Sequence, residues 1–205
     1  MKNLAFSLLF LFPIISYAQE EVLLAQKEIK HFQQALNDEY KNPTKSPLEA
    51  KALKRFKKHD FFPVDLKYRV VARLTITENT PFFQMKTTGD RLPQYRVFGS
   101  ILFTLDGVDY QLPVYQSKDL LKTPTYEDYL FLPFTDLTNG KESYVAGRYL
   151  ELRMPKEGNE VLVDFNKAYN PYCAYTDRYA CPLVPSENHL DTEIRAGVRF
   201  VEKKK

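Results

Sequence analysis

Glycine is scarce in this sequence, and its scarcity excludes several familiar chemistries. Only 7 glycines occur among the 205 residues. They form no G-x-G-x-x-G fingerprint for a dinucleotide, no phosphate-binding P-loop and no G-x-S-x-G turn around a nucleophilic serine. The chain therefore carries none of the short glycine motifs that mark nucleotide-binding proteins or serine hydrolases of that type.

An excess of charge of either sign is also missing. The 29 lysines and arginines nearly balance the 26 acidic residues, so the formal net charge is only +3. Proteins that bind nucleic acids or membrane surfaces take their binding energy from a concentrated basic face. The basic runs at 54–58 and 203–205 are typical of a solvated helix face and a chain end. We therefore expect no nucleic-acid partner.

The N-terminus lacks an apolar run long enough to cross a bilayer. A membrane-spanning helix needs about 20 apolar residues, whereas the run from Leu4 to Ile15 holds 12. Lys2 precedes the run, and the small residues Ser16 and Ala18 follow it, as in a signal-peptidase site. We predict a signal peptide over residues 1–18 and an exported protein, periplasmic or secreted, without stable membrane insertion after cleavage. The alternative is a retained membrane anchor.

Cysteine is rare, and its two occurrences lie close together. Cys173 and Cys181 are eight residues apart. In an oxidising compartment, an isolated pair at this spacing predicts a disulfide. Closing a loop of about nine residues would stabilise the fold by roughly 2.5 kcal/mol. Two free buried thiols, or a catalytic or metal-binding thiol, are the alternatives.

Histidine is also rare, with three occurrences, which weakens the case for a metal site. His189 and Glu187 follow the two cysteines and could complete a ligand set. Zinc sites, however, usually contain a short pair such as C-x-x-C, and none is present here. His31 and His59 belong to the helical part of the chain and are expected at the surface. We predict no metal and no cofactor.

The residues after the predicted cleavage point have a helical period. Apolar and aromatic side chains recur every three or four positions from Glu20 to Tyr40, which predicts an amphipathic helix. Lys41-Asn42-Pro43 ends it. Ser46-Pro47-Leu48-Glu49 then has the form of a capping box and predicts a second helix that runs to about Lys58.

After Pro63 the pattern becomes alternating, as in strands. Asp106-Gly107 and Glu157-Gly158-Asn159 predict hairpin turns between such segments. We predict a mainly β fold with two N-terminal helices, in which an antiparallel meander curls into a barrel or a sandwich. Residues 19–45 would form the first helix and a linker, and residues 46–205 a single β-rich domain. The expected strands are Tyr68–Thr77, Gln94–Leu105, Val108–Tyr115, Tyr129–Thr135, Gly147–Met154, Val161–Asn166 and Ile194–Val201.

Two stretches of the sequence resemble a known bacterial family. One reads F-x-P-F-x-D followed by G-x-E-x-Y-x-x-G-R-Y, and the other reads D-F-N-x-A-Y-N-P-x-C-A-Y followed by C-P-x-x-P-x-E-N. They resemble a family catalogued as domain of unknown function number sixteen eighty-four, over residues 46–199. The resemblance implies a shared fold and a shared signature region, and it brings no established activity.

The signature region contains several charged residues, of which Arg148 is the most informative. It opens a predicted strand in which the alternate residues Leu150 and Leu152 are apolar, so its side chain is expected to point inward. A charge on an inward face is costly unless it is paired. We expect a buried bridge from Arg148 to Asp164 or Glu142. The functional alternative is a pocket in which Arg148 receives an anion and a carboxylate acts as acid or base.

The segment 167–190 predicts a long irregular loop rather than a helix or a strand. Asn166, Asn170 and Asn188 can satisfy backbone groups that lack a ladder partner. Loops of this length in a compact domain usually serve a function. The candidate ligand-binding residues from this loop and the signature charges are Asp136, Glu142, Tyr144, Arg148, Asp164, Asn166, Tyr169, Asn170, Glu187 and Asn188.

Together these features favour a small-ligand-binding or structural module with its site at residues 134–149 and 164–190. The ligand is a small molecule whose identity the sequence does not name. The alternative is a hydrolytic enzyme that uses the same carboxylates and Arg148. A split-barrel cofactor binder is a third hypothesis, and it rests on fold analogy alone. No nucleophile–base pair is recognisable, which favours binding over catalysis.

Overall fold

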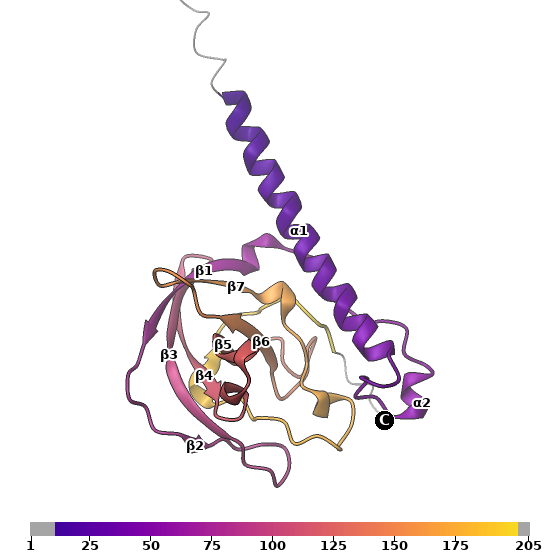
Figure 1. Ribbon diagram of the computed structural model, residues 1–205. Helices are drawn as coiled ribbons and strands as arrows, with labels where there is room; N and C mark the ends of the chain where they lie inside the picture. The colour runs from indigo at the N-terminus through magenta and orange to yellow at the C-terminus, as the bar shows by residue number, and fades with distance from the viewer. Residues whose placement is uncertain (1–10, 201–205) are drawn as a thin grey trace, which may run out of the picture.

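The structure is a computed structural model that describes residues 11–200 (Figure 1). Within this range, eight strands form one sheet, and two α-helices precede it in the chain. The helices are α1 (Leu11–Lys41) and α2 (Ala50–Leu53); the strands are β1 (Arg69–Ile76), β2 (Phe83–Gln84), β3 (Gln94–Leu105), β4 (Val108–Ser117), β5 (Tyr129–Asp136), β6 (Arg148–Arg153), β7 (Glu160–Asp164) and β8 (His189–Leu190). Short 3-10 turns are η1 (Leu66–Tyr68), η2 (Leu120–Lys122), η3 (Pro124–Tyr126), η4 (Phe165–Lys167), η5 (Tyr172–Ala174) and η6 (Ser186–Asn188).

The sheet is a curled antiparallel meander. Its main path has the order β6-β5-β4-β3-β1-β7, while β2 pairs with β3 and β8 adds to β5 in parallel. The edge strands β6 and β7 approach each other to within 8 Å between Cα atoms but do not pair. The prediction of a mainly antiparallel β fold is therefore confirmed, and the sheet forms a half-barrel.

The predicted hairpin at residues 157–159 is wrong, because β6 and β7 are opposite edges of the sheet. β7 pairs with β1, where Asp164 lies opposite Arg69 and accepts a hydrogen bond of 2.7 Å from its Nη1. The edge of β6 that faces away from β5 pairs with the 167–190 loop, since Tyr149 exchanges backbone hydrogen bonds of 2.9 and 3.1 Å with Tyr169. Each strand has thus found a different partner.

The Asp106-Gly107 turn between β3 and β4 is as expected. Asp106 has φ 50° and Gly107 has φ 80°, both in the left-handed region. Two consecutive residues with positive φ match the right-handed twist of the strands that they join. The long β3–β4 hairpin therefore forms around the two-residue turn that the Asp-Gly sequence predicted.

The core occupies the inside of the half-barrel, and a smaller aromatic cluster covers part of the outside. Leu130, Leu132 and Phe134 of β5 point inward and are fully buried. Tyr129 and Phe131 of the same strand point outward, into the second cluster. Successive side chains of a strand alternate between its faces, so β5 is buried on both.

Helix α1 is amphipathic, as predicted, and its C-terminal half runs alongside the segment that follows β7 (Figure 1). Its own residues Ile29 and Tyr40 are buried on the face that packs against the rest of the protein. Glu28 accepts a hydrogen bond of 2.6 Å from Arg69, which links the helix to β1. The helix begins at Leu11, so the predicted cleavage point after Ala18 falls inside it, while residues 1–10 of the predicted signal peptide lie outside the described residues. Among the described residues, no helix is long and apolar enough to cross a membrane.

The second predicted helix is wrong in both its start and its length. α2 spans only Ala50–Leu53, and its N-cap is Glu49, whose side chain makes no capping hydrogen bond. Ser46 is used elsewhere: its Oγ donates to the carbonyl of Tyr40 at 2.7 Å and accepts from the N–H of Leu48 at 3.2 Å. The expected capping serine therefore ties the chain to the end of α1 and does not start a helix.

The predicted strand Ile194–Val201 is also wrong. Residues 194–200 run without a ladder, and Val201 lies outside the described residues. Their backbone groups have individual partners: Gly197 accepts from Phe62 at 3.0 Å, and Val198 donates to Ala168 at 2.9 Å. Other carbonyls of this segment accept hydrogen bonds from a buried arginine side chain, which replaces a neighbouring strand.

His59 is buried, contrary to the expectation of a surface residue, whereas His31 is exposed. The backbone N–H of His59 donates to Asn37 Oδ1 at 2.7 Å, and its ring Nδ1 lies 3.0 Å from the same oxygen. The ring of Tyr40 packs edge-on against it at 4.3 Å. Burial lowers the pKa of His59 to about 4, so the imidazole is neutral and Nδ1–H can donate to the amide oxygen.

Candidate functional site

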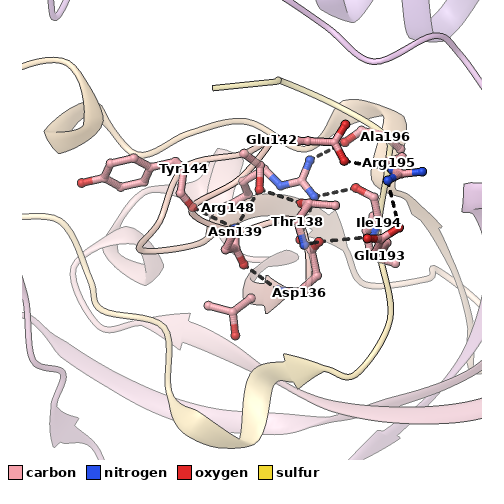
Figure 2. A network of polar contacts seen from close by, with 12 residues as sticks. Asp136, Thr138, Asn139, Glu142, Tyr144, Arg148, Glu193, Ile194, Arg195 and Ala196 are labelled. Atoms are coloured by element: carbon pink, nitrogen blue, oxygen red, sulfur yellow. Dashed lines mark hydrogen bonds and ion pairs between the residues drawn. The ribbon is translucent and has the colours of Figure 1, made fainter. Parts of the chain in front are cut away.

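Arg148 lies at the centre of a buried polar network (Figure 2). As the first residue of β6 it points into the half-barrel, and its side chain is fully buried. Nη2 donates to Asp136 Oδ2 and to the carbonyl of Ile194, both at 2.7 Å. Nη1 donates to the carbonyl of Ala196. The guanidinium therefore joins β5 and β6 to the segment that was expected to be a strand.

Both sides of this ion pair are closed to solvent. The side chains of Arg148 and Asp136 are each 0% exposed. The second oxygen of Asp136 accepts from the N–H groups of Thr138 at 2.8 Å and Ile194 at 3.2 Å. Burial lowers the pKa of Arg148 while Asp136 opposes that shift, and the guanidinium stays charged. The network is a structural clamp, and a ligand cannot reach it in this arrangement.

Arg148 is buried and paired as expected, but its predicted partners are wrong. Asp164 instead pairs with Arg69 Nη1 at 2.7 Å. Glu142 pairs with Arg195 Nε at 3.0 Å, at the surface. Asp136 takes the place of both because it ends β5, the strand that pairs directly with β6.

Two of the predicted asparagines, Asn166 and Asn188, bond to backbone groups, and the third, Asn170, bonds to a side chain. Asn166 accepts from the N–H of Asp65 at 3.0 Å and donates to its carbonyl at 2.9 Å. Asn188 donates to the carbonyl of Pro113 at 2.9 Å. Asn170 donates to a tyrosine hydroxyl of the same loop at 3.0 Å. All three are buried, so they stabilise the fold from inside.

Two further candidate residues, Glu187 and Tyr144, contact different parts of the chain. Glu187 is exposed, with one carboxylate oxygen 3.5 Å from the hydroxyl of Tyr115. The ring of Tyr144 packs edge-on against Phe200 at 5.4 Å.

The predicted disulfide is wrong for this structure, in which Cys173 and Cys181 are free thiols that are not at disulfide distance. The N–H of Cys173 donates to Cys181 Sγ at 3.3 Å. The loop is held by other contacts: Thr88 N–H donates to the carbonyl of Cys181 at 2.9 Å, and Leu183 N–H donates to that of Lys86 at 2.8 Å. These backbone bonds to residues 86–88 supply the restraint that was expected from a covalent bridge.

The two thiols differ in their ionisation. A hydrogen bond from Cys181 lowers the pKa of Cys173 to about 6, with smaller contributions from Thr88 and Tyr144, while burial acts in the opposite direction. The same contact, together with burial, raises the pKa of Cys181. Cys173 is therefore the thiolate of the pair at neutral pH. No set of three or more His, Cys, Asp or Glu side chains in the described part of the chain is arranged to hold a metal ion.

A cavity of about 360 Å³ lies between α1, β6 and the first part of the 167–190 loop. We call it the α1 cleft. Strand alternation supplies its floor, because Tyr149 and Glu151 point out of the half-barrel while their neighbours Arg148 and Leu150 point in. The residues that line it are Phe32, Leu36, Glu39, Tyr149, Glu151, Tyr169, Pro171, Tyr172 and Cys181.

Two tyrosine–glutamate pairs connect the walls of the α1 cleft. Tyr169 donates to Glu151 Oε1 at 3.0 Å, and Tyr172 donates to Glu39 Oε1 at 2.5 Å. Burial raises the pKa of both tyrosines, and the neighbouring carboxylates raise it further. The hydroxyls therefore stay protonated and hold the two carboxylates in fixed orientations.

Of the residues predicted to bind a ligand, Tyr169 alone lines this cleft, together with Cys181 from the predicted disulfide. The rest of the lining was missed, above all Glu39 on α1 and the outward residues of β6. The alternation on β6 places Tyr149 and Glu151 on the face opposite Arg148, so that signal was available. The position of α1 across this face had no local signal.

The comparisons with known proteins identify the family. Residues 54–199 match the family described as "Protein of unknown function (DUF1684)". The chain belongs to this family. The match covers β1 to β8 and both signature stretches, so the family resemblance predicted from the sequence is confirmed. A search of curated proteins found no match.

A solved structure also resembles this member of the family. It is the solution NMR structure of an uncharacterized protein of Haloarcula marismortui, with 32% sequence identity and a TM-score of 0.69. The match covers 88% of this chain and 97% of that one. The half-barrel is thus found in an experimental structure of a similar sequence.

Proposed function

We propose that the mature chain is an exported small-ligand-binding protein whose ligand occupies the α1 cleft. The observation that carries the proposal is the cavity of about 360 Å³ in which two glutamates are held by tyrosine hydroxyls. Small-molecule sites are typically concave, mostly apolar and equipped with a few oriented polar groups, at volumes of roughly 300–1,000 Å³. The α1 cleft has each of these properties.

The walls of the cleft are held in place before any ligand arrives. Glu28 on α1 and Asp164 on β7 both bind Arg69, with distances of 2.6 and 2.7 Å. Tyr172 adds a second link between the loop and the helix through Glu39. Cleavage after Ala18 would leave this part of α1 in the mature chain, so the proposed export and the proposed site are compatible.

The hydrolase alternative depended on Arg148, and this residue has no free surface. Its side chain is 0% exposed and its terminal nitrogens donate to Asp136 and to backbone carbonyls. A catalytic arginine must reach the charge that develops on the substrate. Binding in the α1 cleft is the function that the geometry favours.

The test starts from native protein of the producing cells. Its N-terminus should be Gln19, as expected for an exported and cleaved chain. Native mass spectrometry should then detect a small molecule that stays bound, and Leu36→Trp should abolish this adduct, because the larger ring fills the cleft that Leu36 lines. Thermal melts should change little for this partly exposed position.

Leu92→Trp is the matched control, because Leu92 is 46% exposed and lies outside the cleft. This variant should keep the adduct. A native chain that carries no bound molecule, or an adduct that survives Leu36→Trp, would count against the proposed site.

A further inference from the structure

We infer that the α1 cleft takes a small organic ammonium cation. This inference rests on the proposed function and adds the chemical class of the ligand. The juxtaposition that carries it is a pair of carboxylates, Glu39 and Glu151, on the walls of one cavity that is otherwise lined mainly by aromatic rings.

The carboxylates keep acceptor capacity for a ligand. Each accepts one tyrosine hydroxyl at its Oε1. Within the described side chains, the Oε2 of Glu39 and of Glu151 has neither a hydrogen bond nor an ion pair, and no lysine, arginine or histidine lines the cavity. Two negative groups without a basic partner make the cavity electrostatically complementary to a cation.

The aromatic lining favours an organic cation over a hydrated metal ion. Phe32, Tyr149, Tyr169 and Tyr172 contribute ring surfaces to the same cavity. An ammonium group near such faces is attracted by the ring quadrupole, and the attraction is largest when the site is partly desolvated. Leu36 and Pro171 add apolar surface for the carbon part of the ligand.

An anionic or strongly acceptor-rich ligand would find no free donor among the tyrosines. Tyr169 and Tyr172 already donate to the two glutamates, and Tyr149 donates to the carbonyl of Pro182. Burial raises the pKa of all three, so their protons are retained and remain in these bonds. The cleft therefore presents acceptors and ring faces, which is the chemistry that recognises an ammonium group.

The experiment compares three probes of one shape: phenethylammonium, 2-phenylethanol and phenylacetate. Binding is measured by protein-observed NMR titration of the mature chain at low and at physiological salt. Phenethylammonium should bind at least roughly tenfold more tightly than 2-phenylethanol, and phenylacetate should not bind. Glu151→Gln and Glu39→Gln should each weaken phenethylammonium by roughly three- to tenfold, because glutamine keeps the tyrosine hydrogen bond and removes the charge.

Glu157→Gln, in the exposed turn after β6, is the control and should leave all three affinities unchanged. Equal binding of 2-phenylethanol, tighter binding of phenylacetate, or failure of phenethylammonium to bind would overturn the inferred class. Insensitivity of phenethylammonium to both glutamine variants would overturn it as well. These failures remain distinct from failure of the proposed function, because a native adduct that Leu36→Trp removes would still establish the cleft as a binding site for another class of molecule.

Discussion

Arg148 and Tyr149 are neighbours in the chain, yet they belong to two regions with opposite properties. Arg148 points into the half-barrel, where its terminal nitrogens have partners within the protein. Tyr149 points out and lines the α1 cleft, where two carboxylates each keep an oxygen without a described partner. One strand therefore presents an enclosed ion pair on one face, where the Nε of Arg148 has no hydrogen-bond partner among the described residues, and carboxylates with spare acceptor oxygens on the other. A charged side chain stabilises the fold when its hydrogen-bond partners all belong to the protein. It becomes a candidate binding group when one of its atoms is left without such a partner beside a cavity.

The sharpest way to break this comparison is to remove Arg148. Arg148→Met should destabilise the fold by about 3–5 kcal/mol, because Asp136 would be left charged and buried without its partner. Arg148→Met combined with Asp136→Asn should recover part of this loss, which denaturant melts of the two single variants and the double variant would measure as a coupling free energy.

Arg195→Met provides the matched surface control. Arg195 pairs with Glu142 at 3.0 Å, but the two side chains are 53% and 32% exposed, so solvent screens the pair. Its loss should cost less than about 1 kcal/mol. If Arg148→Met and Arg195→Met cost the same, the buried network would not be the structural clamp described above.

Much of this two-sided strand could be predicted from the sequence. The alternation Arg148, Leu150, Leu152 correctly indicates an inward, paired arginine. The partner could not be predicted, because Asp136 reaches Arg148 only through the register of β5 with β6, in which Phe134 lies opposite Arg148. The connection that sets this register, residues 137–147, contains Asn139-Gly140, but it is longer than the two-residue loop whose geometry alone would fix the register. Local alternation therefore indicates which face a charge takes but not which carboxylate meets it.

The α1 cleft was harder to predict because its residues come from elements that are far apart in the sequence. The helical period of α1 and the strand period of β6 are both legible in the sequence. Glu39 and Tyr172 are 133 residues apart, however, and they meet only because the helix packs over the loop. No local pattern encodes that packing. The prediction for residues 194–200 was wrong for a different reason. Their composition is typical of a strand, but the side chain of Arg148, and not a neighbouring strand, donates hydrogen bonds to the carbonyls of Ile194 and Ala196.

The second prediction concerns a buried titratable group near the helical wall of the cleft. His59 packs against Tyr40, and Tyr40 packs against Tyr172 of the cleft. The folded pKa of His59, about 4, lies below the ordinary value of 6.5. As the pH falls below 6.5, the unfolded chain takes up a proton that the folded chain does not, so stability decreases until the pH reaches about 4, by up to about 3 kcal/mol in total.

Denaturant melts at several pH values would measure this loss. His59→Gln removes the titration and keeps a donor for Asn37, so its stability should fall less steeply than that of the wild type between pH 6.5 and 4. His31→Gln, at an exposed position, should follow the wild-type curve. Parallel curves for wild type and His59→Gln would show that His59 is not held neutral.

The last prediction concerns the two thiols. It involves the smallest change in stability and tests the polar contacts beside the cleft. Cys173 is partly exposed and its pKa is lowered to about 6, first by the hydrogen bond from Cys181. Alkylation of Cys173 by iodoacetamide should therefore reach half of its maximal rate near pH 6, whereas an ordinary thiol does so near 8.5. Cys181→Ala removes the donor and should move this midpoint upward by at least one pH unit. Mass spectrometry of tryptic peptides separates the two sites, and Cys181, which is 8% exposed and has a raised pKa, should react much more slowly.

A native chain whose cysteines react only after reduction would mean that the sulfurs are bonded. A midpoint above pH 8 would mean that Cys173 is an ordinary thiol and that its hydrogen bond from Cys181 is weak. The polar contacts beside the cleft would then differ from those of Arg148 in strength, and not only in the carboxylate oxygens that lack a partner.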